Sequence, residues 1–252
     1  MKTAVVLSMV LALTSIGCSH PIPVIQHDKV AVVTTIQLSP VEQMIQSVPL
    51  VVYEGAVGAG VLFKVDDKIG MITAAHVISD HNATETTPET YATKPICIIG
   101  YAVGTETIIY GSIAKVLAMD PLHDWAVLSI ESPHNDMRFS EFSSSLPAVG
   151  ESVWAVGSPL GESGSISRGI VCHPWRMKPV STGKTAPFIH TDAAGTFGSS
   201  GGGLFNDKGV CIGIVARKHP TNDTMYVVPT YLIQEQICSL ILGVELMPPF
   251  VP

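Results

Sequence analysis

The chain has 252 residues, of which 46% are hydrophobic and only 14% are charged. This composition is too apolar for a disordered chain and too poor in charged residues for a coiled coil, and the length fits one large domain or two small ones. The net charge is −7 and no run of Lys or Arg is present, so we expect no nucleic-acid partner. The 22 glycines and 18 prolines recur at short intervals, a pattern typical of many short strands joined by turns.

The first 17 residues have the features of an export signal. Met1-Lys2 gives a short basic start, and Ala4–Leu13 is an apolar stretch too short to span a bilayer. Gly17 directly before Cys18 resembles the lipobox of bacterial lipoproteins, in which the cysteine becomes the lipidated N-terminus. The alternative is an ordinary cleaved signal followed by an incidental cysteine. We therefore expect an exported protein of the bacterial cell envelope that faces the periplasm and contacts the membrane through a lipid anchor at Cys18.

Short helices are predicted at two places only. Residues 18–45 are expected to form a tether that ends in a helix, because Ser39-Pro40-Val41-Glu42 is a capping box with proline at the first helical position. Near the end of the chain, apolar residues at helical spacing before Gly243 predict a C-terminal helix over about 230–242, followed by a tail over 244–252. These apolar residues are Ile233, Ile237, Leu240 and Ile241.

Between the two helices, short β-rich runs alternate with Gly, Pro, Asp and Ser clusters. The polar segment Glu131–Leu146 divides the runs into a first group over about 48–131 and a second over about 146–230. The first group contains the predicted strands Leu50–Tyr53, Gly60–Val65, Gly70–Thr73, Ile96–Ile99, Thr107–Tyr110, Ile113–Ala118 and Ala126–Ile130. The second contains Ser152–Ala155, Gly169–Val171, Phe188–Thr191, Gly209–Val215 and Met225–Val228. No helix separates the strands, so a βαβ fold is excluded and two antiparallel β modules are expected.

The cysteines give no metal site. If Cys18 is acylated, Cys97, Cys172, Cys211 and Cys238 remain, and these allow three disulfide connectivities between which the sequence does not choose. Cys172 and Cys211 lie in apolar runs and are interpreted as buried thiols. No C-x-x-C or H-E-x-x-H pattern occurs, so we expect neither a metal nor a cofactor.

A serine between glycines is the strongest chemical signal. Gly198-Ser199-Ser200-Gly201-Gly202 supplies what a nucleophilic serine needs, because glycine permits a tight turn and leaves room for backbone N–H groups to face a developing oxyanion. The pattern alone also fits a simple loop, and it fits the nucleophile elbow of α/β-hydrolases.

Chain order distinguishes the two catalytic alternatives. An elbow needs a helix after the serine with Asp and His downstream, but the segment after Ser200 is a poor helix. Upstream, His76 follows the apolar run Met71-Ile72, and Asp124 precedes an apolar run. The order His, Asp, Ser matches the chymotrypsin arrangement. His123 is a rival base, set aside because neighbouring strand residues face opposite ways.

Several segments in the same order carry a family resemblance. The matching segments are Gly58–Leu62, Thr73–Val77, Asp120–Leu128, Val149–Glu151, Ala155–Gly161, Ser167–Val171, Thr191–Ala194 and Gly198–Gly202. Together they resemble HtrA/Deg-type trypsin-like serine proteases over roughly Gly58 to Pro229. Ser199 departs from that family, whose members often have Asn there and whose digestive relatives have Asp. Only nine residues follow Gly243, so the resemblance is to a protease domain without a PDZ domain.

The resemblance implies an all-β fold of two packed six-stranded antiparallel β-barrels, chymotrypsin-like, over about 46–243. It implies a serine endopeptidase acting on extended or misfolded polypeptides, in which His76 and Asp124 come from the first barrel and Ser200 from the second. The N–H groups of Gly198 and Ser200 would form the oxyanion hole. Because free histidine has a pKa of about 6.5, activity is expected to rise between about pH 6 and 7.

The substrate pocket is expected between the residues just before Ser200 and a later strand. Its predicted residues are Ala194, Gly195, Thr196, Ile214, Val215 and Ala216. No acid is among them, which favours small or medium apolar side chains over Lys or Arg, with the substrate added as a strand along Ile214–Ala216. Asp192 is expected to support the loop. Many relatives are trimers, so a homo-oligomer is an open expectation. The alternative function is a non-proteolytic peptide-binding or chaperone-like protein on the same fold.

Overall fold

The computed structural model describes residues 38–79, 94–180, 184–195, 197–219, 221–234 and 237. These residues belong to one compact unit that begins at Leu38. Several predictions therefore lie outside the described residues: the signal peptide 1–17, Cys18 and the tether up to residue 37, Thr196, Cys238, and the tail 244–252.

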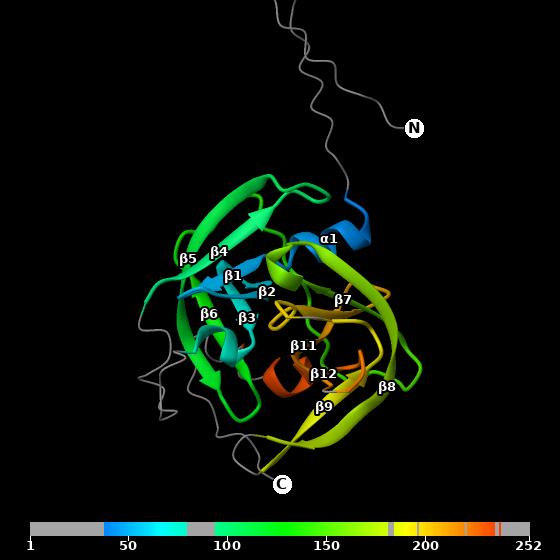
Figure 1. The fold of residues 1–252 in the computed structure, drawn as a ribbon. Helices are drawn as coiled ribbons and strands as arrows, with labels where there is room; N and C mark the ends of the chain where they lie inside the picture. The colour runs from blue at the N-terminus through cyan, green and yellow to red at the C-terminus, as the bar shows by residue number, and fades with distance from the viewer. Residues whose placement is uncertain are drawn as a thin grey trace, which may run out of the picture. The chain divides into compact units, whose positions relative to one another are not determined.

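The described residues contain twelve strands in two closed antiparallel barrels (Figure 1). The first barrel has the strand order β1-β2-β3-β6-β5-β4 and the second has the order β10-β11-β12-β9-β8-β7. The first six strands are β1 Leu50–Tyr53, β2 Ala56–Val65, β3 Lys68–Thr73, β4 Ile96–Tyr101, β5 Ile108–Asp120 and β6 Trp125–Ile130. The second six are β7 Ser152–Gly157, β8 Ser165–Pro179, β9 Thr185–Thr191, β10 Gly203–Asn206, β11 Cys211–Lys218 and β12 Met225–Pro229. The predicted fold class is confirmed.

Alternation along the strands builds three apolar cores. In β2, Leu62 packs in the interior of the first barrel, whereas Val61 and Phe63 pack in the core between the two barrels. In β11, Ile212 faces the interior of the second barrel, whereas Ile214 joins the shared core. Because strands at the junction are buried on both faces, they read as continuous apolar runs rather than as alternating ones. Among the described residues, the core shared by the two barrels is the largest of the three apolar clusters.

The helices close the ends of the shared core. Helix α1 (Pro40–Gln46) begins with the predicted capping box, in which Ser39 and Glu42 bond to each other's backbone N–H. Its Met44 is buried in the shared core, as are Ile233 and Ile237 of the C-terminal helix. Residues 230–234 and 237 are helical, and the rest of the predicted span lies outside the described residues. No helix among the described residues is long and apolar enough to cross a membrane.

Three strand predictions differ from the structure. Thr107–Tyr110 and Ile113–Ala118 are parts of one strand, β5, because Gly111 stays extended where a break was expected. Strand β8 has fifteen residues where only Gly169–Val171 was predicted, since its polar residues lie on an exposed hairpin. The segment after the serine motif, interpreted only as a poor helix, forms the short strand β10 between β7 and β11. Its pairing, rather than its own glycine-rich sequence, makes it a strand.

Candidate active site

His76 and Asp124 are in direct contact in the first barrel. His76 lies in the 3₁₀ turn η1 (Ala75–Ile78) that follows β3, and Asp124 lies directly before β6. The ring Nδ1 of His76 is 2.8 Å from Asp124 Oδ2 and 3.0 Å from Oδ1, and the backbone N–H of His76 also donates to Oδ1 at 3.0 Å. The side chain of His76 is 49% exposed and that of Asp124 only 12%. This places a half-open imidazole on a largely buried carboxylate.

Backbone strain helps to aim Asp124 at His76. Asp124 has φ 62°, in the left-handed region that non-glycine residues rarely adopt. Aspartate tolerates this region better than most residues, and such strain gathers at functional sites. The strained turn also holds Asp120, which accepts hydrogen bonds from the backbone N–H groups of Leu122 and His123.

The rival histidine is bound elsewhere. His123 Nδ1 is 2.6 Å from Asp120 Oδ2, so its ring belongs to the turn rather than to Asp124. The reason given for setting it aside was wrong, since residues 121–124 form a turn and not a strand. The two histidines therefore differ in their carboxylate partners: His76 contacts Asp124, and His123 contacts Asp120.

The environment of His76 favours its protonated form. Burial of the ring is the largest single influence on its pKa and lowers it. The hydrogen bond and the negative charge of Asp124 both raise the pKa and together outweigh burial, while the positive charge of Arg217 lowers it. The pKa of His76 therefore lies above the ordinary histidine value.

The loop that carries Ser200, Gly198–Gly202, is called the nucleophile loop. Its backbone packs against the first barrel. Ala59 N–H in β2 donates to Ser200 O at 2.8 Å, which joins the two barrels at the proposed nucleophile. Gly201 has φ 81°, and a Cβ placed on it would lie 2.1 Å from Ala59 O and 2.3 Å from Thr73 Oγ1. Only glycine fits at this position, because both the conformation and the space exclude a side chain.

Ser200 and His76 approach each other across Gly58. A Cβ on Gly58 would lie 2.7 Å from the Val77 side chain and 2.9 Å from Ser200 O. Gly58 therefore lies between Val77, the neighbour of His76 in the chain, and the backbone of Ser200. No hydrogen bond joins Ser200 Oγ to the His76 ring within the described part of the chain. Such contacts are often longer before substrate binds. The structure brings the His–Asp pair together and sets the serine loop beside it.

The peptide between Phe197 and Gly198 is oriented by a neighbouring turn. Leu160, in η3 (Pro159–Gly161), donates its N–H to Phe197 O at 2.7 Å. In a trans peptide the next N–H points the opposite way, so this bond turns the Gly198 N–H away from Leu160. Among the described residues, neither the Gly198 nor the Ser200 N–H donates a hydrogen bond. Both N–H groups of the predicted oxyanion hole are therefore unengaged.

A cavity of about 170 Å³ lies next to the nucleophile loop, within the second barrel. Of the predicted pocket residues, Ala194, Gly195 and Val215 line it, while Thr196 lies outside the described residues. Met225 also lines the cavity although it was not predicted, and its sulfur packs closely against Gly195. Met225 comes from β12, and only the barrel topology brings it to the loop.

The edge of β11 available to an added strand differs from the predicted one. Ile214 is paired with Gly203 of β10, and Val215 both accepts from Gly201 N–H and donates to Gly202 O. Strand β10 ends its pairing there, so the open edge comprises Ala216–Lys218 within the described chain. The predicted strand Ile214–Ala216 therefore overlaps this open edge only at Ala216.

Other predicted residues have structural roles. Asp192 Oδ1 accepts from Ile170 N–H at 2.7 Å, which fits the expected loop support. Cys211 is fully buried, as predicted, and burial raises its pKa to about 12, whereas Cys172 is only half-buried. Cys97, Cys172 and Cys211 are free thiols, and Cys238 lies outside the described residues.

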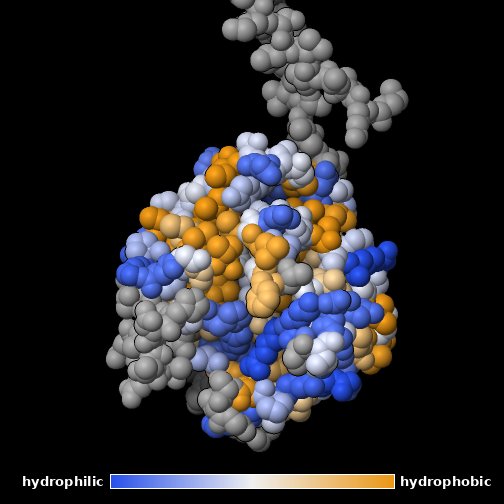
Figure 2. Space-filling model, viewed as in Figure 1, coloured by the Kyte–Doolittle hydropathy of each residue, from blue (hydrophilic) through white to orange (hydrophobic). Residues whose placement is uncertain are grey.

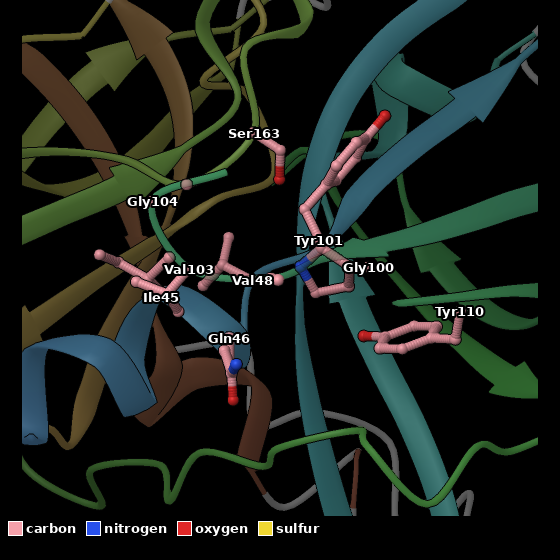
Figure 3. A pocket seen from close by; sticks show the side chains of 12 residues that line it. Ile45, Gln46, Val48, Gly100, Tyr101, Val103, Gly104, Tyr110 and Ser163 are labelled. Atoms are coloured by element: carbon pink, nitrogen blue, oxygen red, sulfur yellow. The ribbon is translucent and has the colours of Figure 1, made fainter. Parts of the chain in front are cut away.

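A second hollow, shown in Figure 3, has no residue in common with this site. It has a volume of about 10 Å³ and is lined from α1, from the end of β4 and its turn, and from Ser163-Gly164. That is room for about one water molecule. The Tyr110 hydroxyl at this hollow is buried and has no hydrogen-bond partner among the described residues.

Known proteins share this architecture. Residues 58–214 match the trypsin-like peptidase domain family. The chain is 34% identical over 164 residues to the serine protease Do-like HtrA of Lactobacillus helveticus, covering 64% of this chain and 35% of that protein. It is 43% identical over 101 residues to a probable periplasmic serine endoprotease, DegP-like, of Pseudomonas putida, covering 40% of this chain and 20% of that protein.

The matched region is thus a minor part of each curated relative. Among solved structures, the serine endoprotease from Yersinia pestis superposes with a TM-score of 0.59 at 23% identity, covering 82% of this chain and 68% of that one. At this identity the likeness concerns the fold alone. Since the family match spans more than half of the chain, the protein belongs to the trypsin-like peptidase domain family.

Proposed function

We propose that the protein is a serine endopeptidase that hydrolyses peptide bonds in extended polypeptides. The observation that carries the proposal is the contact between His76 Nδ1 and Asp124, placed beside a glycine-bounded serine loop at the barrel junction. A carboxylate on Nδ1 fixes the imidazole tautomer whose Nε2 accepts a proton. The closeness of Val77 and of Ser200 O to Gly58 supports the choice of Ser200 as the partner of this histidine.

The proposed reaction uses only groups of this chain. Ser200 Oγ attacks the scissile carbonyl carbon as its proton passes to His76 Nε2, and the carbonyl oxygen gains the negative charge. The N–H groups of Gly198 and Ser200 stabilise that oxyanion, each by about 3 kcal/mol. The imidazolium then protonates the departing amine. Water next attacks the ester carbon of the acyl-enzyme as its proton passes to His76 Nε2, and the imidazolium returns a proton to Ser200 Oγ as the acid product leaves. Asp124 stabilises the imidazolium throughout.

The primary pocket is proposed to accept small or medium apolar side chains. Its cavity is lined mainly by apolar residues, and no acid contributes to it. Met225 fills part of the space beside Gly195, which limits the depth available. A peptide library should show cleavage after Ala or Val in preference to Arg; preferred cleavage after Arg would overturn this assignment.

The cellular setting is proposed from the sequence and a relative. An envelope location agrees with the name of the periplasmic Pseudomonas relative. The lipid anchor at Cys18 and a homo-oligomer belong to the same proposal. Labelling with radioactive palmitate in a bacterial host, lost in Cys18→Ser, tests the anchor.

Reaction with a fluorophosphonate probe tests the enzymatic function. The probe should label the wild-type protein at about pH 8 and should not label Ser200→Ala. Ser199→Ala is the matched control, because it removes the adjacent hydroxyl and should leave labelling in place. Absence of labelling in correctly folded protein would favour the non-proteolytic peptide binder instead.

A further inference from the structure

A row of basic and aromatic residues crosses the second barrel beside the proposed active site. His173 of β8 is opposite His190 of β9, His190 is opposite Tyr226 of β12, and Tyr226 is opposite Arg217 of β11. Residues opposite each other in antiparallel strands share a face of the sheet. The rings of His190 and Tyr226 stack with their centroids 5.1 Å apart. The row therefore has an ordered aromatic centre and a permanent cation at one end.

Two further cations lie on the same face. Arg176 is opposite Phe188 and Lys178 is opposite Ala186, both across the β8–β9 hairpin. We call Arg176, Lys178 and Arg217 the cationic patch. Figure 2 shows hydrophilic residues gathered in a band over the region of β9, β11 and β12 in this view. The patch stands out because the whole chain carries a net charge of −7.

The charges of the patch are not neutralised by carboxylates. Lys178 Nζ lies 4.8 Å from the centroid of the Tyr226 ring, and the guanidinium of Arg217 lies 5.0 Å from that of Phe188. Arg217 Nη1 also donates to Pro179 O at 3.1 Å. Among the described residues, none of the three forms a salt bridge, whereas the neighbouring Lys218 pairs with Asp223 at 2.7 Å. Ring faces hold Lys178 and Arg217 in place, and a carbonyl also holds Arg217, without cancelling their charge.

The patch is continuous with the proposed active site. Arg217 lies two residues beyond Val215, whose carbonyl accepts from Gly201 N–H beside Ser200. It also occupies the centre of the open edge Ala216–Lys218. The pairings between β7–β12 are antiparallel, and an added segment is expected to follow the same pattern, although an isolated bridge from Phe142 to Cys211 of β11 is parallel. A substrate running antiparallel to β11 from Ser200 directs its residues on the amino side of the scissile bond past Arg217 and on toward Lys178.

We propose that the cationic patch selects polypeptide substrates with acidic side chains a few residues before the scissile bond. This inference rests on the proposed peptidase function, which it extends by naming a charge preference. The guanidinium of Arg217 retains donors for a carboxylate beyond the one used on Pro179 O, because an arginine has five N–H groups. A charge at the edge of an interface acts mainly through the association rate and is sensitive to salt.

Binding to Ser200→Ala protein tests the preference apart from catalysis. Fluorescein-labelled peptides with one apolar Ala-Val core would carry three Glu, three Gln or three Lys residues before the core. We expect the Glu peptide to bind about fivefold or more tightly than the Gln peptide at about 50 mM NaCl, with the Lys peptide weakest. The preference should largely vanish at about 500 mM NaCl, and moving the Glu residues after the core should abolish it. Fluorescence anisotropy measures all four cases.

Two substitutions assign the effect to the patch. Arg217→Gln should remove most of the Glu preference, measured as the ratio of the dissociation constants of the Gln and Glu peptides for the same variant, and Arg217→Lys should keep part of it. Arg168→Gln is the matched control, because Arg168, which is in β8, also lies over an aromatic ring, 4.8 Å from the Trp154 centroid, and the variant loses the same charge as Arg217→Gln. Arg168 pairs instead with Ser152 and Asp207.

The outcomes separate this inference from the proposed function. Equal dissociation constants for Glu and Gln peptides, or equal losses in Arg217→Gln and Arg168→Gln, would overturn the charge preference. A clear Glu preference in a protein that no fluorophosphonate labels would preserve the binding site and refute the peptidase. If Arg217→Gln fails to fold, as judged by circular dichroism, the Arg217→Lys variant and the peptide with Glu after the core still decide the matter.

Discussion

The two barrels contribute to the candidate site by different means. The first barrel supplies side chains: a half-exposed imidazole and the carboxylate that orients it, joined at 2.8 Å. The second supplies mostly backbone, namely the glycine-rich loop around Ser200 and the open strand edge Ala216–Lys218. Glycines of the second barrel at the junction, such as Gly157 and Gly202, would each bring a Cβ within about 3 Å of neighbouring backbone atoms.

Because of this difference, substitutions in the two barrels should affect activity and fold stability differently. Changing a side chain at the open end of the first barrel should alter the reaction and leave the fold, because few packing contacts are lost. Adding a single carbon atom to the loop of the second barrel should alter both, because the loop is in contact with β2 and β7. Kinetic and stability measurements on paired variants test this contrast.

His76→Ala should produce the largest change in activity. Without the base, kcat/KM is expected to fall by about 10⁴- to 10⁶-fold. Because the side chain is 49% exposed, we expect the free energy of unfolding to change by no more than about 1 kcal/mol. Peptide hydrolysis and thermal unfolding of the same preparation measure both quantities. A large loss of stability with this variant would show that the first barrel depends on the His76–Asp124 contact for its fold.

Gly201→Ala should damage both properties. Its Cβ would lie 2.1 Å from Ala59 O at a φ of 81°, so we expect a loss of about 3 kcal/mol or more in the free energy of unfolding, together with loss of activity. Gly104→Ala is the matched control in the first barrel, since Gly104 has a φ of 72° with nothing within 4 Å of a Cβ. It should lose only about 1 to 2 kcal/mol and keep full activity. Urea unfolding curves compare the two, and equal losses would refute the role assigned to crowding.

The pH profile should show how the two barrels act on one histidine. The reaction needs neutral His76, and its pKa lies above 6.5, so activity should rise with pH through a midpoint above that value. Arg217→Gln removes a charge that lowers this pKa, so the midpoint should move upward. Asp124→Asn removes the two influences that raise it, so burial prevails and the residual activity should have a midpoint below 6.5. An unchanged midpoint in Arg217→Gln would show that the charge of Arg217 does not influence the pKa of His76.

The contrast between the barrels also explains what the sequence predicted. His76 and Asp124 were predicted as a pair from the chain order His, Asp, Ser and from the segments Thr73–Val77 and Asp120–Leu128, which resemble the family and lie beside apolar runs. The strand β10 was missed because it is only four residues long and begins and ends with residues that disfavour strands, Gly203 and Asn206, so its pairing with β7 and β11 decides its conformation. Local patterns therefore sufficed for the side-chain half of the site.

The backbone half depends on contacts that no local pattern encodes. The predicted pairing edge Ile214–Ala216 overlapped the open edge only at Ala216, because which carbonyls of β11 are already used depends on Gly201 and Gly202. Met225 and Arg217 join the site through register between β11 and β12. The register between two strands is set by turns and bulges that lie far from the residues it brings together. It could therefore not be predicted from the sequence near Met225 and Arg217.

Tyr110→Phe should give the smallest change, an increase in stability. The hydroxyl is buried in the first barrel with no partner in the part of the chain that the structure describes, and a buried donor left unsatisfied costs about 1 to 3 kcal/mol. Burial also raises the pKa of Tyr110, as expected for a group that avoids ionisation. Removing the oxygen keeps the ring packed against Gly100 and should raise the free energy of unfolding by about 1 kcal/mol, or the melting temperature by about 2 to 4 °C. Tyr101→Phe, at the same hollow but only half-buried, is the control and should change stability by less than about 0.5 kcal/mol. Destabilisation of Tyr110→Phe would instead mean that a water molecule in the hollow satisfies the hydroxyl, which would make this part of the first barrel depend on a polar contact after all.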